Sequence, residues 1–135
     1  MICQDHGMTN YTVKNLKEVE NMAEKFGIGD GLEARFARGP LELSNLGLSY
    51  QRLEPNFRIP FGHKHGEQEE VYVLISGSGR MKLDDEIVEL KQWDAIRVPG
   101  EVARNFEAGP DGAELLAIGA PIAKDTEMLQ GWWTD

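Results

Sequence analysis

The stretch Gly62–Gly79, GHKHGEQEEVYVLISGSG, contains the strongest structural and functional signal in the chain. His63 and His65 are separated by one residue, so in an extended strand both imidazoles lie on the same face. Glu70 opens an alternating run that the Ser-Gly-Ser-Gly sequence at 76–79 is expected to end as a turn. Two imidazoles and a carboxylate brought together at the end of a sheet form a set of metal ligands.

The spacing within this stretch resembles the first sequence motif of the cupin superfamily: His-x-His, four residues, Glu, six residues, Gly. His63, His65, Glu70 and Gly77 fall on that pattern, although the family's Gly six residues before the first His is Phe57 here. The resemblance implies an all-β jelly-roll barrel, also described as a double-stranded β-helix, of the small single-domain kind with a type-2-like conserved barrel. It also implies that the two histidines and the glutamate are metal ligands.

The family's second motif is Gly-Asp, a short strand, Pro, a Gly turn and then a His. Residues 93–100, WDAIRVPG, match it except that Trp93 replaces the Gly and the His is missing. Counting forward from the glycine turn reaches Ala103, whereas counting back from the aromatic Phe106 reaches Arg104. The second count is favoured because Arg104 and Phe106 then share a face by alternation. Neither residue is a metal ligand.

The site therefore has two open interpretations. In the first, a three-ligand site with open positions binds Fe(II), Mn(II), Ni(II) or Zn(II). Arg104 opposes tight binding, because a guanidinium about 5 Å from a divalent ion costs on the order of 6 kcal/mol at an effective dielectric near 20. An anionic substrate that bridges the metal and Arg104 would offset this cost and make the site selective for carboxylates. In the second, Arg104 pairs with Glu70 and the metal site is lost.

Cupins include dioxygenases, isomerases, decarboxylases, sugar-binding regulatory domains and seed storage proteins, so the resemblance does not decide the activity. The first hypothesis is a metal-dependent dioxygenase or isomerase whose small anionic substrate is oriented by Arg104 and Tyr72. The second is a non-catalytic small-molecule-binding domain in which Arg104 is paired with Glu70. No organic cofactor is expected in either case.

The composition excludes several classes of partner. The chain has 135 residues, of which 14 are basic and 23 acidic, so its net charge is -9. This charge repels nucleic-acid phosphates and acidic membrane surfaces. The only cysteine, Cys3, allows no intrachain disulfide, and the first dozen residues show no signal-peptide pattern. We therefore predict a cytoplasmic protein with a small-molecule ligand.

The chain outside the histidine stretch predicts one short helix followed by strands. Apolar residues recur at steps of three and four from Tyr11 to Phe26, which indicates an amphipathic helix ending at Gly27. Short β-type segments separated by turn residues follow, as in an antiparallel sandwich or barrel. They are 32–37, 41–44, 46–53, the strand from Glu70, 80–83, 87–90, 95–98, 102–108 and 114–119, with a further turn at 109–112.

We divide the chain into an N-terminal extension and helical segment at 1–39, a barrel at 40–120 and a tail at 121–135. The strand from Glu70 carries Val71, Val73 and Ile75 on the face opposite the glutamate, so it is apolar on both faces. Such a strand is buried on both faces. The helical segment, the tail or a second copy of the chain must cover the outer face, and the resemblance favours a homodimer.

Overall fold

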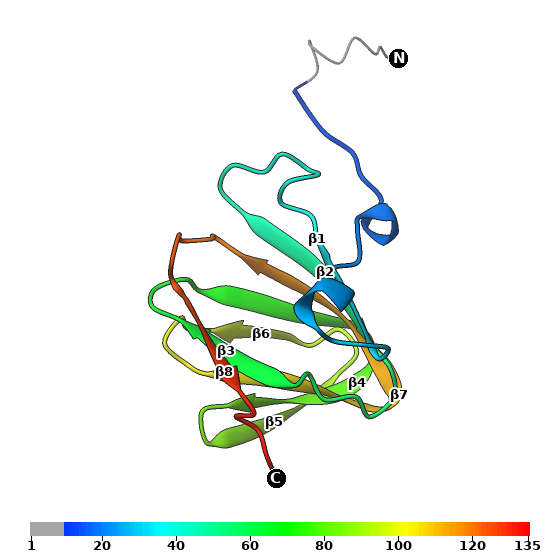
Figure 1. The fold of residues 1–135 in the computed structure, drawn as a ribbon, viewed down its shortest axis with the longest axis vertical. Coiled ribbons are helices and arrows are strands. Elements are labelled where there is room, and N and C mark those ends of the chain that lie inside the picture. The colour runs from blue at the N-terminus through cyan, green and yellow to red at the C-terminus, as the bar shows by residue number, and fades with distance from the viewer. Residues whose placement is uncertain (1–9) are drawn as a thin grey trace.

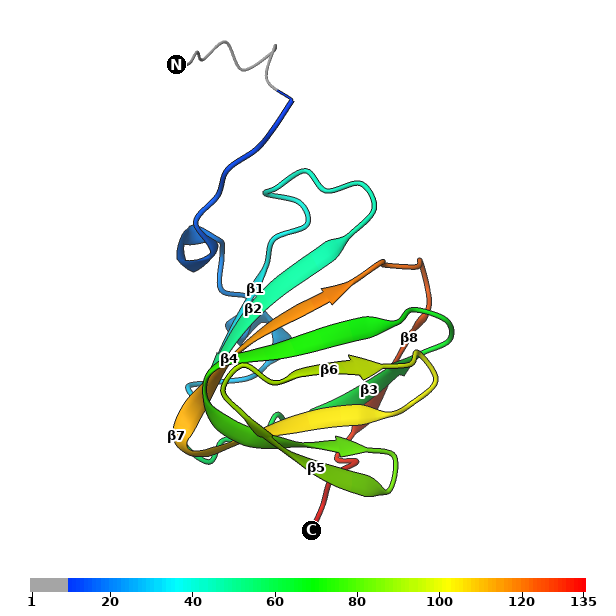
Figure 2. The same cartoon turned by 180° about the vertical axis from the view of Figure 1, so that it is seen from behind.

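Residues 10–135 are described by a computed structural model, in which eight strands curl into an antiparallel barrel (Figures 1 and 2). Cys3 and the start of the predicted N-terminal extension lie outside the described residues. Two single-turn 3-10 helices, η2 (Leu16–Glu18) and η3 (Glu24–Phe26), precede the barrel. The strands are β1 (Leu32–Phe36), β2 (Gly47–Leu53), β3 (Phe61–His65), β4 (Glu70–Leu83), β5 (Glu86–Lys91), β6 (Ala95–Val98), β7 (Arg104–Gly119) and β8 (Thr126–Gln130).

The two long strands, β4 and β7, pair with each other and serve both halves of the barrel. In one half the order is β1-β2-β7-β4-β6, and in the other it is β8-β3-β7-β4-β5. All of these pairs are antiparallel. The nearly all-β, curled architecture confirms the predicted jelly-roll barrel with a short N-terminal helical segment.

Two predicted turns are wrong, because the glycines there form bulges within continuous strands. β4 runs through the predicted turn at 76–79, and β7 runs through the predicted turn at 109–112. Their register shifts between Gly77 and Gly79 of β4, opposite Ala113 and Ala108 of β7. Gly77 has a φ of 80°, and a Cβ on it would overlap the carbonyl of Gly112, so the bulge requires glycine there.

The predicted helix over 11–26 is also wrong as a continuous element. Asn21 interrupts it by forming a bridge with Arg35 of β1, and its side chain accepts hydrogen bonds from the amides of Ala23 and Ala34. These bonds tie the chain to the sheet edge between η2 and η3, so no α-helix can run through this point. The predicted end at Gly27 is confirmed, since Gly27 caps η3 with a φ of 77°.

The remaining differences lie at the two ends of the barrel. The segment 41–44, predicted as a strand, is a loop in which Glu42 has a φ of 59°. The C-terminal tail contains a strand that was not predicted, β8, which pairs with β3 from Phe61↔Gln130 to His65↔Thr126. This pairing places the tail directly beside the strand that carries both histidines.

The core fills the inside of the barrel with side chains from both long strands. Leu74 and Met81 of β4 and Leu115 of β7 are almost completely buried. The outward-facing Val71, Val73 and Ile75 are only partly covered in the single chain, and the homodimer stays a prediction. Within residues 10–135, none of the helices has the length and apolarity to span a membrane.

Candidate metal centre

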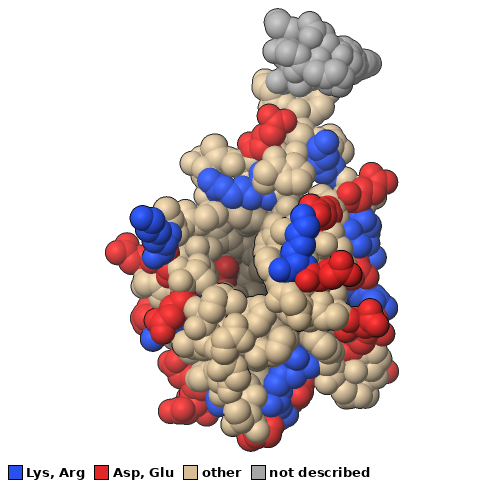
Figure 3. Space-filling model, viewed as in Figure 1, with Lys and Arg blue, Asp and Glu red and all other residues tan. Residues whose placement is uncertain are grey.

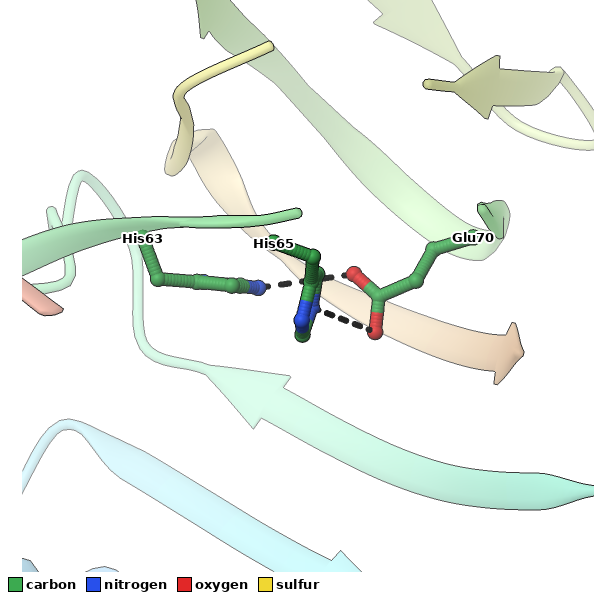
Figure 4. A group of neighbouring side chains, drawn as sticks. All are labelled: His63, His65 and Glu70. Atoms are coloured by element: carbon green, nitrogen blue, oxygen red, sulfur yellow. Dashed lines mark hydrogen bonds and ion pairs between the residues drawn. The ribbon is translucent and has the colours of Figure 1, made fainter. Parts of the chain in front are cut away.

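The three predicted ligands come together at one end of the barrel. Strand β3 presents His63 and His65 on the same face, and the loop 66–69 leads directly into β4, whose first residue is Glu70. Figure 4 shows both imidazoles directed at the Glu70 carboxylate. The candidate ligand atoms of the three residues all lie within 4.8 Å of one another.

Each histidine faces a different oxygen of Glu70. The Nε2 atom of His63 lies 3.4 Å from Oε1, and the Nε2 atom of His65 lies 3.5 Å from Oε2. The Nε2 atom of His65 is buried and has no hydrogen-bond partner among residues 10–135. A buried polar atom without a partner is costly, so this nitrogen is suited to a further ligand such as a metal ion.

Oxygen Oε1 of Glu70 is held by two further donors. The guanidinium of Arg104 donates to it through Nη1 at 2.9 Å, and the phenol of Tyr72 donates to it at 2.5 Å. A second nitrogen of Arg104, Nη2, donates to the carbonyl of Pro99 at 2.7 Å, which fixes the guanidinium. Oxygen Oε2 accepts a long hydrogen bond, 3.4 Å, from the side-chain amide of Gln68 and lies 3.5 Å from Nε2 of His65. Oε2 is therefore the more available oxygen for a metal.

The pKa shifts of Glu70 and His65 favour the forms that bind a metal. Burial acts to raise the pKa of Glu70, but hydrogen bonds from His63 and Tyr72 and the charge of both imidazoles lower it to about 2. Burial also lowers the pKa of His65, and the positive charge of Arg104 adds to this effect. Burial raises the pKa of Tyr72, so its phenol keeps the proton that it donates. A carboxylate and a neutral imidazole are the forms that bind a metal.

The donor set therefore fits a divalent metal ion: His63, His65 and Glu70 could hold one through Nε2, Nε2 and Oε2. Two nitrogens and one oxygen suit the middle and late first-row metals. Arg104 contacts the other oxygen of Glu70, so its ion pair and a metal would use different atoms of the carboxylate, but Nη1 of Arg104 also lies 3.4 Å from Nε2 of His63.

The prediction that Arg104, rather than Ala103, points at the site agrees with the backbone register. Arg104 of β7 pairs directly with His63 of β3, and its side chain is 1% exposed. The amide of Ala103 donates to the Asp84 side chain, away from the ligands. The assignment of Arg104 and Tyr72 to substrate binding stays a prediction.

Two side chains that contact His65 were missed by the sequence analysis. The Nδ1 atom of His65 lies 3.1 Å from the hydroxyl of Thr126 and 3.9 Å from the carboxylate of Asp125. Both residues belong to the C-terminal segment, where no strand was expected. Partners of this kind orient a ligating imidazole and select its tautomer. The alternation of Thr126 with Met128 was the one available signal that the tail contains a strand.

The candidate ligands line a cavity of about 480 Å³. Figure 3 shows a hollow with an acidic side chain at its bottom, and among the described residues that line the cavity Glu70 is the one with an acidic side chain. Apolar side chains form most of the remaining wall, including Phe26 and Phe36, which the sequence analysis did not assign to a site. The site can therefore accept a small molecule beside the ligands.

The second motif is consistent with the same architecture. Trp93 occupies the position of the family's glycine and has a φ of 74°, a conformation that glycine adopts without strain. The strand that follows, β6 (Ala95–Val98), has the predicted bounds and pairs with β4 next to Glu70. The backbone of the motif is therefore kept even though its glycine and histidine are not.

Known proteins resemble this chain in part of its sequence and in its fold. No family model matches the chain. An uncharacterised protein of Methanocaldococcus jannaschii is 35% identical over 71 residues, so the match spans half of this chain and 57% of that protein. A cupin protein from Bacteroides fragilis superposes with a TM-score of 0.70 and 24% identity, covering 87% of this chain and 89% of the other.

Oxalate decarboxylase from Bacillus subtilis superposes with a TM-score of 0.68 and 26% identity over 87% of this chain, but over only 33% of the longer enzyme. The barrel architecture, the two motifs and these structural neighbours agree. The chain has the cupin fold.

Proposed function

We propose that this cupin is a metal-dependent enzyme of small-molecule metabolism, in which His63, His65 and Glu70 hold a divalent ion and the cavity takes a small anionic substrate. One observation carries the proposal. The buried Nε2 atom of His65 has no hydrogen-bond partner in the described part of the chain and lies beside a histidine nitrogen and a carboxylate oxygen that complete a ligand set.

The charges around the cavity support an anionic substrate. Arg104 and Glu70 form an ion pair and cancel each other, and no other lysine, arginine, aspartate or glutamate of the described residues lines the cavity. With a divalent ion bound, the site would carry an excess of about two positive charges in a mostly apolar wall, where charges are weakly screened. An anion therefore balances the site. The neighbouring oxalate decarboxylase is named for a small dicarboxylate.

The chain's own residues have separate roles in this proposal. Arg104 holds Oε1 of Glu70 in place and offers positive charge next to the ligands, while Tyr72 donates a second bond to the same oxygen. A bound metal would supply Lewis-acid chemistry and open coordination positions for substrate. We place the reaction among those of dioxygenases or isomerases.

Metal content provides the test. Elemental analysis of untagged protein, after incubation with Fe(II), Mn(II), Ni(II) or Zn(II) and dialysis, should show near-stoichiometric metal. His63→Ala should remove it. Lys64→Ala is the matched control, because Lys64 is adjacent in β3 and its ammonium lies 3.9 Å from Glu127, outside the site. Equal metal retention in wild type and His63→Ala would contradict the proposal.

A second candidate function rests on the ion pair itself. The 2.9 Å contact between Arg104 and Glu70 favours a non-catalytic binding domain if it prevents metal uptake. A wild-type site that stays empty with all four metals would support this alternative. The search would then turn to ligands of the metal-free cavity.

A further inference from the structure

We propose that the ligand of this cavity is an aryl-alkyl carboxylate, whose carboxylate lies at the metal centre and whose ring lies against Phe26 and Phe36. The anionic end rests on the proposed function. The aromatic end rests on a separate part of the cavity, formed by η3 and β1.

The cavity opens at the end of β1. The cavity is lined by alternate residues of this strand: Leu32, Ala34 and Phe36. Leu32 is 8% exposed and Ala34 is 3% exposed, whereas Phe36 is 43% exposed. Phe26 of η3 lines the same cavity and is 49% exposed. Two half-exposed phenylalanines on one cavity wall offer apolar surface that the folded chain does not itself cover.

The two phenylalanines form a defined aromatic pair. Their ring centroids are 5.8 Å apart, and the planes meet at 67°, an edge-to-face arrangement. This geometry leaves ring surface open to a third aromatic group, for which stacked and edge-to-face contacts are favourable. In the described chain, no charged side chain other than Glu70 and Arg104 lines the cavity, so its mouth suits an uncharged ring.

The strand register gives the separation between this pair and the metal centre. Phe36 pairs with Ser49, Ser49 with Ala117, and Ala117 with Tyr72, and all four residues line the cavity. The row crosses three interstrand spacings. Three spacings of about 4.8 Å give about 14 Å between the backbones, and the inward-pointing side chains shorten this gap to on the order of 10 Å. Because Tyr72 contacts Glu70, the gap separates the phenylalanine pair from the metal centre. A ring joined directly to a carboxylate is too short to reach both ends, whereas two or three intervening methylene groups suffice.

A homologous ligand series tests the proposal. Mn(II)-loaded protein would be titrated by calorimetry with acetate, benzoate, 3-phenylpropionate and 4-phenylbutyrate. We expect affinity to rise at least tenfold from acetate to the best ring-bearing probe, because apolar ring surface is removed from water. The best probe should be one of the two longer acids. Equal affinities across the series, or benzoate as the best ligand, would overturn the proposal.

Variants locate the ring. Phe36→Ala should weaken the longer acids roughly tenfold and leave acetate unchanged, since it removes an aromatic contact. Phe36→Leu, which keeps an apolar side chain if the alanine variant does not fold, should give a smaller loss in the same direction. Tyr11→Ala is the control, because Tyr11 is 63% exposed and does not line the cavity. Unchanged affinity in both Phe36 variants would exclude the proposed ring position.

The uncharged probe 3-phenylpropan-1-ol separates this inference from the metal proposal. If the protein takes up no metal, the proposed function fails. Binding of this alcohol to metal-free protein, weakened by Phe36→Ala, would still support the aromatic mouth. Metal uptake without any preference for ring-bearing probes would leave the proposed function intact and contradict the ring site alone.

Discussion

Glu70 presents its two carboxylate oxygens to different partners. Oε1 accepts from Arg104 and Tyr72, whereas Oε2 faces the unpartnered nitrogen of His65. The two interpretations of the sequence, a metal site and an Arg104–Glu70 ion pair, are therefore compatible at the carboxylate, and they compete at Nε2 of His63, which lies 3.4 Å from Nη1 of Arg104. Arg104 lowers metal affinity through its charge, but it does not occupy the oxygen that faces His65.

Replacement of this arginine tests the balance of charge. Arg104→His should tighten Mn(II) or Zn(II) binding by at least about tenfold, because it removes a repulsive charge and adds an imidazole beside His63. Without metal, the same variant should lose about 3 kcal/mol of unfolding free energy, because Glu70 loses its buried partner. Titration of metal and urea unfolding measure the two effects.

Arg97→His is the matched control for this change. The side chain of Arg97 is 62% exposed and pairs with Glu69 at the surface, so neither quantity should change. If Arg104→His binds metal no better than wild type, the histidine does not reach the vacant ligand position.

The site residues that could be predicted are those linked by local spacing. His63, His65 and Glu70 follow from two-residue alternation and one short loop, and Arg104 follows from its alternation with Phe106. Thr126 and Asp125 could not be predicted, because their contact with His65 depends on the pairing of β8 with β3 across some sixty residues of chain.

At the scale of elements, the loop between β3 and β4 is held by the C-terminal segment. The carboxylate of Asp125 accepts hydrogen bonds from the amides of Glu67 and Gln68, and its own carbonyl accepts from Gly66. These bonds fix the loop that joins His65 to Glu70. The contacts are charge-assisted, so they favour the ionised form of Asp125.

Acid titration should reveal this contribution. Backbone hydrogen bonds, chiefly from Gln68, lower the folded-state pKa of Asp125. The stabilisation is therefore complete above the unfolded pKa of about 4 and is lost as the pH falls through the folded value. Asp125→Asn should be less stable than wild type at pH 7 and should approach wild type near pH 3. Urea midpoints across this range measure the difference.

Asp85→Asn serves as the control for this titration, because Asp85 is exposed in the turn between β4 and β5. It should follow wild type at every pH. A constant gap between Asp125→Asn and wild type from pH 7 to pH 3 would show that the carboxylate charge has no part in holding the loop.

Most strands could be predicted from alternation and turn residues, but the interrupted helical segment, the two glycine bulges, the loop at 41–44 and strand β8 could not. The helix over 11–26 follows a valid apolar period, yet the hydrogen bonds of Asn21 to β1 override it. The two glycine turns are bulges because β4 and β7 pair on both sides of them. Local sequence does not distinguish a turn from a bulge when the distinction depends on a distant strand.

At the scale of the whole molecule, the C-terminus is anchored by a cluster of cations and aromatic rings. The ring of Trp133 lies 4.2 Å from the guanidinium of Arg58 and 5.1 Å from that of Arg80. Glu107 of β7 accepts a hydrogen bond from each arginine, at 2.9 and 2.8 Å. This cluster joins the end of the chain to β4 and β7, and it follows directly after β8.

Loss of this anchor should weaken both the fold and the metal centre. Trp133 is 5% exposed, so Trp133→Ala should cost about 3 to 5 kcal/mol of unfolding free energy. It should also loosen metal binding, because β8 supports the histidine strand. Urea unfolding and metal titration test both effects. Trp93→Ala, at a site that is 69% exposed, should change neither. A destabilised Trp133→Ala protein with unaltered metal affinity would separate the tail from the site.

The homodimer and the cytoplasmic location stay predictions at this scale. The partly covered Val71, Val73 and Ile75 provide the reason to expect a second copy on the outer face. Quaternary structure depends on surface shape, which alternation alone does not describe.

The sharing of β4 and β7 by both halves of the barrel has a consequence for how the protein opens. Neither half has a complete set of strands of its own, since each long strand pairs on both sides of its bulge. Partial unfolding of one half would therefore strip partners from the other. The barrel should behave as one cooperative unit, and slow amide exchange at the strands that carry the candidate ligands should then report the stability of the entire fold.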